Sequence, residues 1–325
     1  MAIAKAQHYV PQFLLRNFGD GLNNQVWVYD KTSDRAFITN VKNIAGESRF
    51  YDFEVQGESV TLEPFLSSVE SKAKPVIESV LLSDSLRQLT DEDKEVLTEF
   101  LSIQLARTRS FREEWSNFPR MLRKHFQEHG DEVAADSQAA ELLHELTENE
   151  SKAETGRFIM EAGPLFRQHF AQKEWVLAAT SPTHPFVIGD NPIARQNLNH
   201  SPVGNLGLMS PGIEIYLPLS PTRALAMWCT SLTNHVRREA LLIQNDASRI
   251  EAGSLSDPFG VLALNEALTT GRPVDYSSDN VHNFNSLQIT WSERYVFSSI
   301  NDFGLARKML CAEPRLKRGP QSQAW

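Results

Sequence analysis

His8 could do acid–base chemistry near neutral pH, and it opens the run HYVPQF at residues 8–13. A histidine changes charge near neutral pH, so it can move a proton or bind a metal ion. The apolar residues that follow, Phe13 and Phe18 among them, predict a buried anchor. Two interpretations of His8 stay open. It is a catalytic acid or base, or it ties this segment to the core by hydrogen bonds.

A second polar group lies on a predicted helix. Gln104, Arg107 and Arg112 belong to the run QLARTRSFR at residues 104–112. Side chains three or four positions apart share one helix face, and an arginine beside a glutamine offers donors that hold a carboxylate or a phosphate. We predict that these three residues bind substrate. The alternative is that Arg107 pairs with a structural acid such as Glu63 or Glu70.

Carboxylate and amide side chains are candidates for the reacting centre. Asp190 and Asn191 follow a short apolar run, and functional residues often lie where such a strand ends. We predict catalytic roles for both, with Asp190 and Glu63 holding a divalent metal ion that activates water. The alternatives are local turn chemistry for Asp190 and Asn191, and a solvated or arginine-paired helix face for Glu63.

Both helices and strands must position these residues. Alternating residues at 26–30 and 36–39 predict a hairpin. Apolar residues at helical spacing predict helices over 61–80 and, from the N-cap Thr90, past Arg107 toward Phe118. Apolar runs at 175–179, 186–189, 212–218 and 223–228 predict further strands. The pattern indicates an α+β fold with a mixed or antiparallel sheet and a central helical region.

Composition divides the chain into three stretches. Residues 1–130 are predicted to hold the hairpin and helices, and residues 174–325 a β-rich part integrated with them. Residues 131–173 are predicted to be a helical insertion, because the stretch 132–154 is acidic and has few large apolar residues. This acidic stretch also carries a separate hypothesis, that it binds a protein partner.

Charge and cysteine content limit the protein class. The net charge of −9 argues against broad nucleic-acid binding but leaves room for a local basic site. The two cysteines, Cys229 and Cys311, form neither a disulfide framework nor a zinc motif, which favours a cytoplasmic location. No stretch approaches the length of about 18 apolar residues that a membrane crossing needs, and we expect no signal peptide.

The order of these segments resembles the domain-of-unknown-function family 4238, whose members are mostly bacterial. The run HYVPQFLLRNF at residues 8–18 resembles the family's opening motif. The segments that agree in order are Phe50-Tyr51, Leu62-Glu63 with Glu70, Gln104 with Arg107-Thr108, residues 186–192, residues 217–221, Asn283 or Asn285, and residues 295–297. Two departures stand out, since Arg109 replaces a frequent proline and Gly189 a frequent serine.

The resemblance implies that His8, Gln104, Arg107, Asp190 and Asn191 share a site, but it implies no reaction. We predict a metal-dependent phosphodiesterase or nuclease that uses Mg²⁺ or Mn²⁺, acts on nucleic acid or a nucleotide, and is linked by analogy to phage defence. The alternative is a non-catalytic binding or sensor protein whose polar motifs are structural. No membrane partner is expected, and a homo-oligomer is left open.

Overall fold

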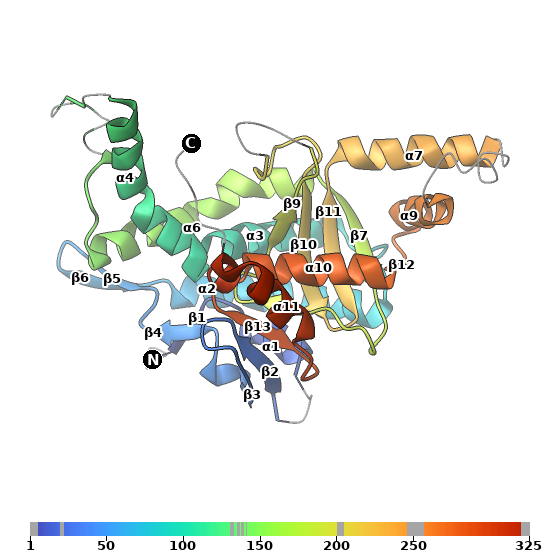
Figure 1. Ribbon diagram of the computed structural model, residues 1–325, viewed down its shortest axis with the longest axis horizontal. Helices are drawn as coiled ribbons and strands as arrows, with labels where there is room; N and C mark the ends of the chain where they lie inside the picture. Colours follow the sequence, from blue (N-terminus) through green and yellow to red (C-terminus); the bar gives the residue numbers. More distant parts are fainter. Residues whose placement is uncertain are drawn as a thin grey trace.

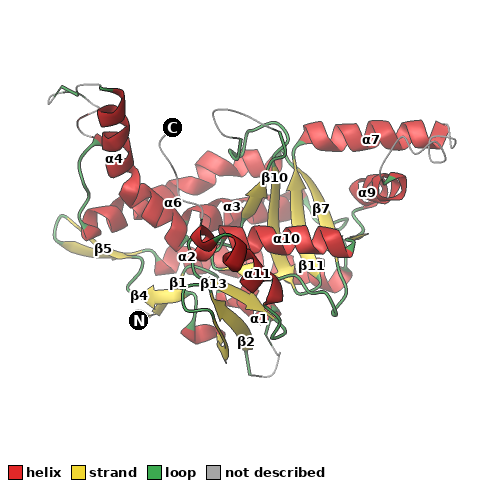
Figure 2. Ribbon diagram, viewed as in Figure 1, coloured by secondary structure: helices red, strands yellow, loops and turns green. Residues whose placement is uncertain are grey.

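The structure is a computed structural model that describes residues 6–19, 23–130, 142–199, 205–245 and 257–319, together with residues 133, 134, 137 and 140. Helices and strands of these residues build an α+β fold, which confirms the predicted class (Figure 1, Figure 2). The strands are β1 (Ala6–His8), β2 (Gln25–Asp30), β3 (Arg35–Asn40), β4 (Gly46–Ser48), β5 (Asp52–Val55), β6 (Glu58–Thr61), β7 (Glu174–Ala179), β8 (Ile188–Gly189), β9 (Ala194–Gln196), β10 (Glu214–Ser220), β11 (Arg223–Trp228), β12 (Val274–Asp275) and β13 (Tyr295–Ser298). The helices are α1 (Gln12–Asn17), α2 (Glu63–Ser83), α3 (Asp91–Ala106), α4 (Arg109–His129), α6 (Glu148–Ala171), α7 (Thr230–Asn245), α9 (Pro258–Thr270), α10 (Ser278–Trp291) and α11 (Gly304–Ala312), with short 3-10 turns η1 (Val41–Asn43) and η2 (Pro314–Lys317).

The larger sheet has five strands in the order β12-β7-β11-β10-β9, antiparallel except for the β12–β7 pair. Alternate residues of its strands point to opposite faces. Leu177, Leu217 and Leu225 are buried in the cluster formed with α2 and α3, whereas Val176 and Ala226 are buried in the cluster formed with α9 and α10. The sheet therefore lies between two helical layers, with α10 crossing its front in Figure 1.

The second sheet joins distant parts of the chain in the order β3-β2-β13-β8. β2 and β3 form the predicted hairpin, which is confirmed, and β13 pairs with the free side of β2. β8 completes the sheet on the other side of β13. Strands from residues 25–40 and from residues 188–298 therefore share one set of backbone hydrogen bonds.

α6 covers the second half of the stretch predicted to be an insertion. It begins at a capping box in which the Thr147 and Glu150 side chains each accept from the other's backbone amide. It packs along α3, and its residues Ile159, Ala162 and Phe170 are fully buried. Much of residues 132–141 lies outside the described residues. The division of the chain at residues 130 and 173 stays a prediction.

The helix predicted to run through Arg107 is interrupted there, so that expectation was wrong. α3 ends at Ala106, and the Thr108 side chain caps a new helix, α4, by accepting from the amide of Phe111 at 3.3 Å. Pro119 lies inside α4 rather than beyond its end. The break places Gln104 in α3 and Arg112 in α4.

None of the helices in the described part of the chain combines the length and apolarity that a membrane crossing requires.

Candidate functional site

His8 lies at the end of β1, and both of its ring nitrogens have protein partners. Nε2 lies 3.2 Å from the carbonyl oxygen of Lys42, and Nδ1 lies 3.3 Å from Nε2 of Gln12. A neutral ring that donates from Nε2 and accepts at Nδ1 satisfies both contacts. Burial lowers the pKa of His8, which favours this neutral form. The geometry supports the structural interpretation, and an acid–base role stays a prediction.

The three residues predicted to bind substrate all donate to backbone carbonyls of the protein itself. Arg107 Nη2 donates to His8 at 2.5 Å and Gln104 Nε2 to Tyr9 at 3.0 Å. Arg112 Nη2 donates to Phe50 at 2.5 Å, and its guanidinium lies 3.4 Å from the centre of the Phe50 ring. These contacts fasten the opening motif and the segment before β5 onto α3 and α4.

Arg107 also has a charged partner, which the sequence left open. Its Nη1 lies 2.7 Å from Glu70 Oε1, and the residue is only 2% exposed. The Tyr51 hydroxyl donates to the carbonyl oxygen of Arg107 at 2.8 Å. The alternative in which Arg107 pairs with a structural acid is therefore confirmed for Glu70. A buried guanidinium held in this way presents no free pair of N–H donors to a substrate.

Asp190 is a backbone-binding carboxylate at the end of β8. Oδ1 accepts from the amide of Glu293 at 2.6 Å, and Oδ2 accepts from the amides of Arg294 and Tyr295, each at 2.9 Å. Asp190 is 3% exposed, and burial raises its pKa against the opposing effect of these amides and Lys31. Its oxygens are engaged in holding the start of β13, and a metal-binding role for Asp190 stays a prediction.

Glu63 lies in a different environment from Asp190. Burial raises the pKa of Glu63, and the charges that act on it are those of Arg107, Glu70 and Asp52. Across the described residues, no three histidine, cysteine or acidic side chains come together in a way that could hold a metal ion. The predicted pairing of Asp190 with Glu63 around one ion therefore finds no support in the geometry.

Asn191, in contrast, lines a cavity of about 420 Å³, which we call the Arg195 cavity. Its wall combines polar and aromatic side chains from α4, α6, β9 and α10. The lining residues are Leu105, Thr108, Ser110, Phe111, Glu114, Phe166, His169, Asn191, Arg195, Gly207, Leu208, Met209 and Trp291. Two segments of the family pattern thus reach the cavity, through Thr108 and Asn191.

Arg195 supplies the positive charge of this cavity. Its guanidinium lies 4.5 Å from the centre of the Trp291 ring, and Nη1 donates to the carbonyl oxygen of Leu206 at 3.1 Å. Nε is buried and has no hydrogen-bond partner among the described residues. Burial lowers the pKa of Arg195, and Glu114 opposes that effect. An oxyanion in the cavity would satisfy both the free donor and the charge.

Three further groups surround Arg195. Burial raises the pKa of Glu114, so its carboxyl group keeps its proton to a higher pH than an exposed one. His169 Nδ1 is buried without a partner among the described residues. Ser110 is 5% exposed and also lines the cavity. These side chains offer several hydrogen bonds to an anion whose remaining surface is apolar.

Sequence reasoning missed Glu114, His169 and Arg195. Arg195 lies four residues beyond Asn191, so the strand after the Asp190 turn was the one signal that could have found it. Glu114 and His169 lie in polar helices where charged residues are common. Only the packing of α4, α6 and β9 brings the three residues to one cavity.

The comparison with protein families gives one result. The model of a family described as a protein of unknown function, DUF4238, matches residues 6–302. The comparisons with curated proteins and with solved structures found no match.

Proposed function

The chain belongs to the DUF4238 family, and from the Arg195 cavity we propose that the protein binds a nucleotide-like molecule. Arg195 receives the phosphate group, with Asn191 and Ser110 as neighbouring hydrogen-bonding groups. The aromatic side chains of Phe111 and Phe166 provide an apolar surface for the base. A cavity of about 420 Å³ is within the range of small-molecule sites.

The observation that carries this proposal is the unpartnered Nε of Arg195. A buried donor without an acceptor costs about 1–3 kcal/mol. Burial also disfavours the charged form of Arg195, and Glu114 is the acid that opposes this effect. A bound phosphate removes both costs, which favours an anion over a neutral ligand.

The predictions about substrate class, metal dependence, biological role, oligomeric state and location remain proposals. Phosphate recognition at Arg195 supports the substrate class of a phosphodiesterase or nuclease, with nucleic acid as the larger form of the same ligand. A metal-dependent reaction with Mg²⁺ or Mn²⁺, a link to phage defence and a homo-oligomer rest on analogy alone. A cytoplasmic location draws support from the two free cysteines, Cys229 and Cys311. The alternative, a non-catalytic binding or sensor protein, uses the same cavity.

Calorimetric titration tests the binding. Purified protein is titrated with a nucleoside monophosphate, the matching nucleoside and inorganic phosphate. We expect the nucleotide to bind most tightly, and Arg195→Gln to weaken it at least about tenfold. Arg238→Gln is the matched control, because the Arg238 side chain is 67% exposed and lies outside the cavity lining. Equal affinities in the wild type and Arg195→Gln would exclude the site.

A second assay separates binding from catalysis. The protein is incubated with RNA and DNA, with and without magnesium or manganese, beside the variants Asn191→Ala and Arg195→Gln. Cleavage that is lost in both variants supports the nuclease proposal. Cleavage that survives in both comes from a contaminant or another site. Nucleotide binding without cleavage supports the sensor alternative.

A further inference from the structure

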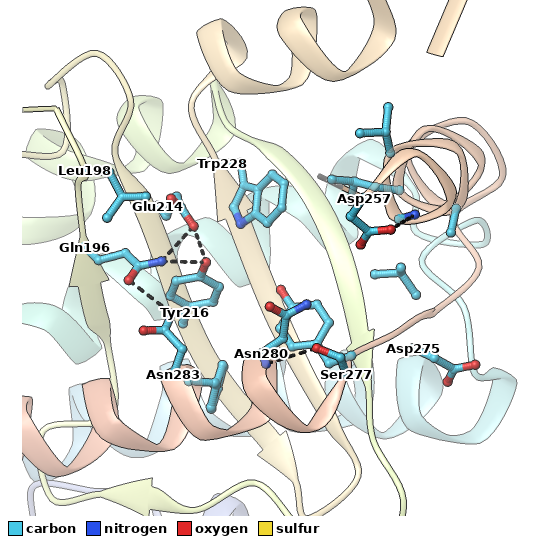
Figure 3. A pocket seen from close by; sticks show the side chains of 17 residues that line it. Gln196, Leu198, Glu214, Tyr216, Trp228, Asp257, Asp275, Ser277, Asn280 and Asn283 are labelled. Carbon is cyan, nitrogen blue, oxygen red and sulfur yellow. Dashed lines mark hydrogen bonds between the residues drawn. The ribbon is translucent and has the colours of Figure 1, made fainter. Parts of the chain in front are cut away.

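A second cavity, of about 500 Å³, lies against the face of the five-stranded sheet that α9 and α10 cover (Figure 3). We call it the Glu214 cavity. Its charged lining residues are all acidic, namely Glu214, Asp257 and Asp275, and none of the described lining residues is Lys, Arg or His. Its aromatic lining residues are Tyr216, Trp228, Tyr276 and Phe284. Negative charge and aromatic rings therefore meet in one space.

Strand pairing places the central residues of this cavity on one face of the sheet. Glu214 on β10 is directly opposite Trp228 on β11, and Tyr216 follows Glu214 by two positions. Residues opposite each other, and residues two positions apart, point to the same side. Figure 3 shows the three side chains facing the same space, with Gln196 beside them.

Glu214 has one engaged oxygen and one oxygen open to a ligand. Its Oε2 accepts from the Tyr216 hydroxyl and from Gln196 Nε2 at 3.0 Å (Figure 3). Within the described residues, Oε1 has no such partner. Because two donors hold the carboxylate in place, its free oxygen has a fixed position. Burial, followed by the charge of Glu214, raises the pKa of Tyr276, which places that ring near the carboxylate.

Trp228 supplies a second, independent feature. Its Nε1 is buried and has no acceptor among the described residues. The indole ring is the aromatic group that attracts cations most strongly. A ligand that suits this wall carries a positive charge for the rings and Glu214, and a neutral oxygen that accepts from the indole N–H.

We propose that the Glu214 cavity binds a small amino alcohol of the choline type. Glu214 Oε1 supplies the counter-charge, and the rings of Trp228, Tyr216 and Tyr276 contact the ammonium group. The hydroxyl oxygen of the ligand accepts from Trp228 Nε1. This site is distinct from the Arg195 cavity, whose charge and ligand are of the opposite sign.

Titration with choline and with its neutral carbon isostere, dimethylbutanol, tests the charge requirement on the full-length protein. The two molecules have nearly the same shape and differ in charge. We expect choline to bind at least about tenfold more tightly than the isostere, and more weakly as salt concentration rises. Equal binding of the two, or no binding of choline at millimolar concentration, would overturn the proposal.

Two variants locate the site. Glu214→Gln removes the charge and is expected to weaken choline binding at least about tenfold. Trp228→Phe keeps a ring but removes Nε1, so it should weaken choline more than tetramethylammonium, which has no hydroxyl. Glu266→Gln, on an exposed position of α9, is the control. Thermal unfolding confirms that each variant is folded. Unchanged choline affinity in folded Glu214→Gln and Trp228→Phe would overturn the assignment.

Discussion

Arg195 and Gln196 are consecutive residues of β9, yet their side chains line different cavities. Arg195 lines the Arg195 cavity with Trp291, whose Nε1 donates to the Arg195 carbonyl oxygen at 2.8 Å. Gln196 faces Glu214 and accepts from Asn283 Nδ2 at 3.3 Å. The alternation of a strand thus separates two sites of opposite charge by one residue.

This separation predicts independent binding. Arg195→Gln is expected to leave the affinity for choline within about twofold of wild type, while nucleotide binding falls. Glu214→Gln is expected to do the reverse. Calorimetric titration of each variant with both ligands checks this. If either variant stays folded but loses affinity for both ligands, β9 transmits the effect of the substitution from one cavity to the other.

Nucleotide binding should depend on pH through Glu114. Burial raises the pKa of this carboxyl group above its ordinary value of 4.5. As pH rises through that raised pKa, Glu114 becomes an anion that competes with the ligand for Arg195, so affinity is expected to fall. A cyclic nucleotide is the probe, because a monoester gains charge near pH ~6. Glu114→Gln should make the nucleotide affinity less dependent on pH. The same dependence of affinity on pH in this variant and in the wild type would contradict the mechanism.

Replacing Arg107 should affect stability rather than binding. Arg107→Ala leaves Glu70 and the carbonyl oxygen of His8 without their donor, and we expect a loss of about 3 kcal/mol in the free energy of unfolding. Nucleotide affinity of the folded protein should stay within about threefold. The neighbouring Arg109 is the control, since its side chain is 42% exposed and Arg109→Ala should cost less than about 1 kcal/mol.

Urea denaturation provides the stability measurement for both variants, and titration provides the affinity. A folded Arg107→Ala protein that has lost nucleotide binding entirely would restore the substrate-binding role predicted for this residue.

Glu293 makes stability depend on pH. Burial and the neighbouring carboxylates of Glu113 and Asp190 raise the pKa of Glu293 to about 7. The folded state therefore favours the protonated form, and its stabilising effect is complete below the ordinary value of 4.5 and is lost as pH rises through about 7. The loss is expected to reach up to about 3 kcal/mol, because each tenfold difference in proton affinity between the folded and unfolded states corresponds to about 1.4 kcal/mol.

The free energy of unfolding, measured by urea between about pH 5 and pH 8, checks this slope. Glu293→Gln should remove most of it, because an amide keeps the hydrogen-bonding capacity without the charge. The exposed variant Glu266→Gln should keep the slope. A wild-type protein equally stable at both ends of the range would contradict the raised pKa.

Two glycines of α6 test how closely this helix is packed. A Cβ on Gly156 would lie 2.5 Å from the Phe53 ring, which is buried, so Gly156→Ala is expected to destabilise the protein by about 1–3 kcal/mol. At Gly163 the nearest atom would be 3.7 Å away. Gly163→Ala should therefore be neutral or stabilise the helix by up to about 1 kcal/mol.

Urea denaturation of the two variants gives the comparison. Equal stability of Gly156→Ala and Gly163→Ala would mean that α6 lies less closely against β5 than the structure shows.

Local patterns were enough to predict the elements whose residues are neighbours in sequence. The β2–β3 hairpin, the strands β10 and β11 and the helix α2 follow from alternation, apolar runs or helical spacing within one segment. The end of α3 was missed because Thr108 acts as an N-cap inside a run that has helical spacing on both sides. Helix capping depends on one side chain, and the helical spacing of apolar residues does not reveal it.

The candidate site was harder to predict, because its residues come from α3, α4, α6, β9, α10 and the segments between elements. The motif residues His8, Arg107 and Asp190 were found by type, but each one binds backbone atoms of a distant segment. Hydrogen bonds of this kind depend on tertiary packing and leave no periodic signal. Of the predicted site residues, Asn191 is the one that lines the Arg195 cavity. Arg195 itself was visible only after β9 had a place in the sheet.

The pairing of β2 with β13 also has a consequence for folding during synthesis on the ribosome. β2 is synthesised early, but its second partner is made only when nearly the whole chain has emerged. Until then one edge of the β2–β3 hairpin exposes unpaired backbone groups, which is a template for pairing with other chains. This edge is therefore open to pairing with other chains until β13 closes the sheet.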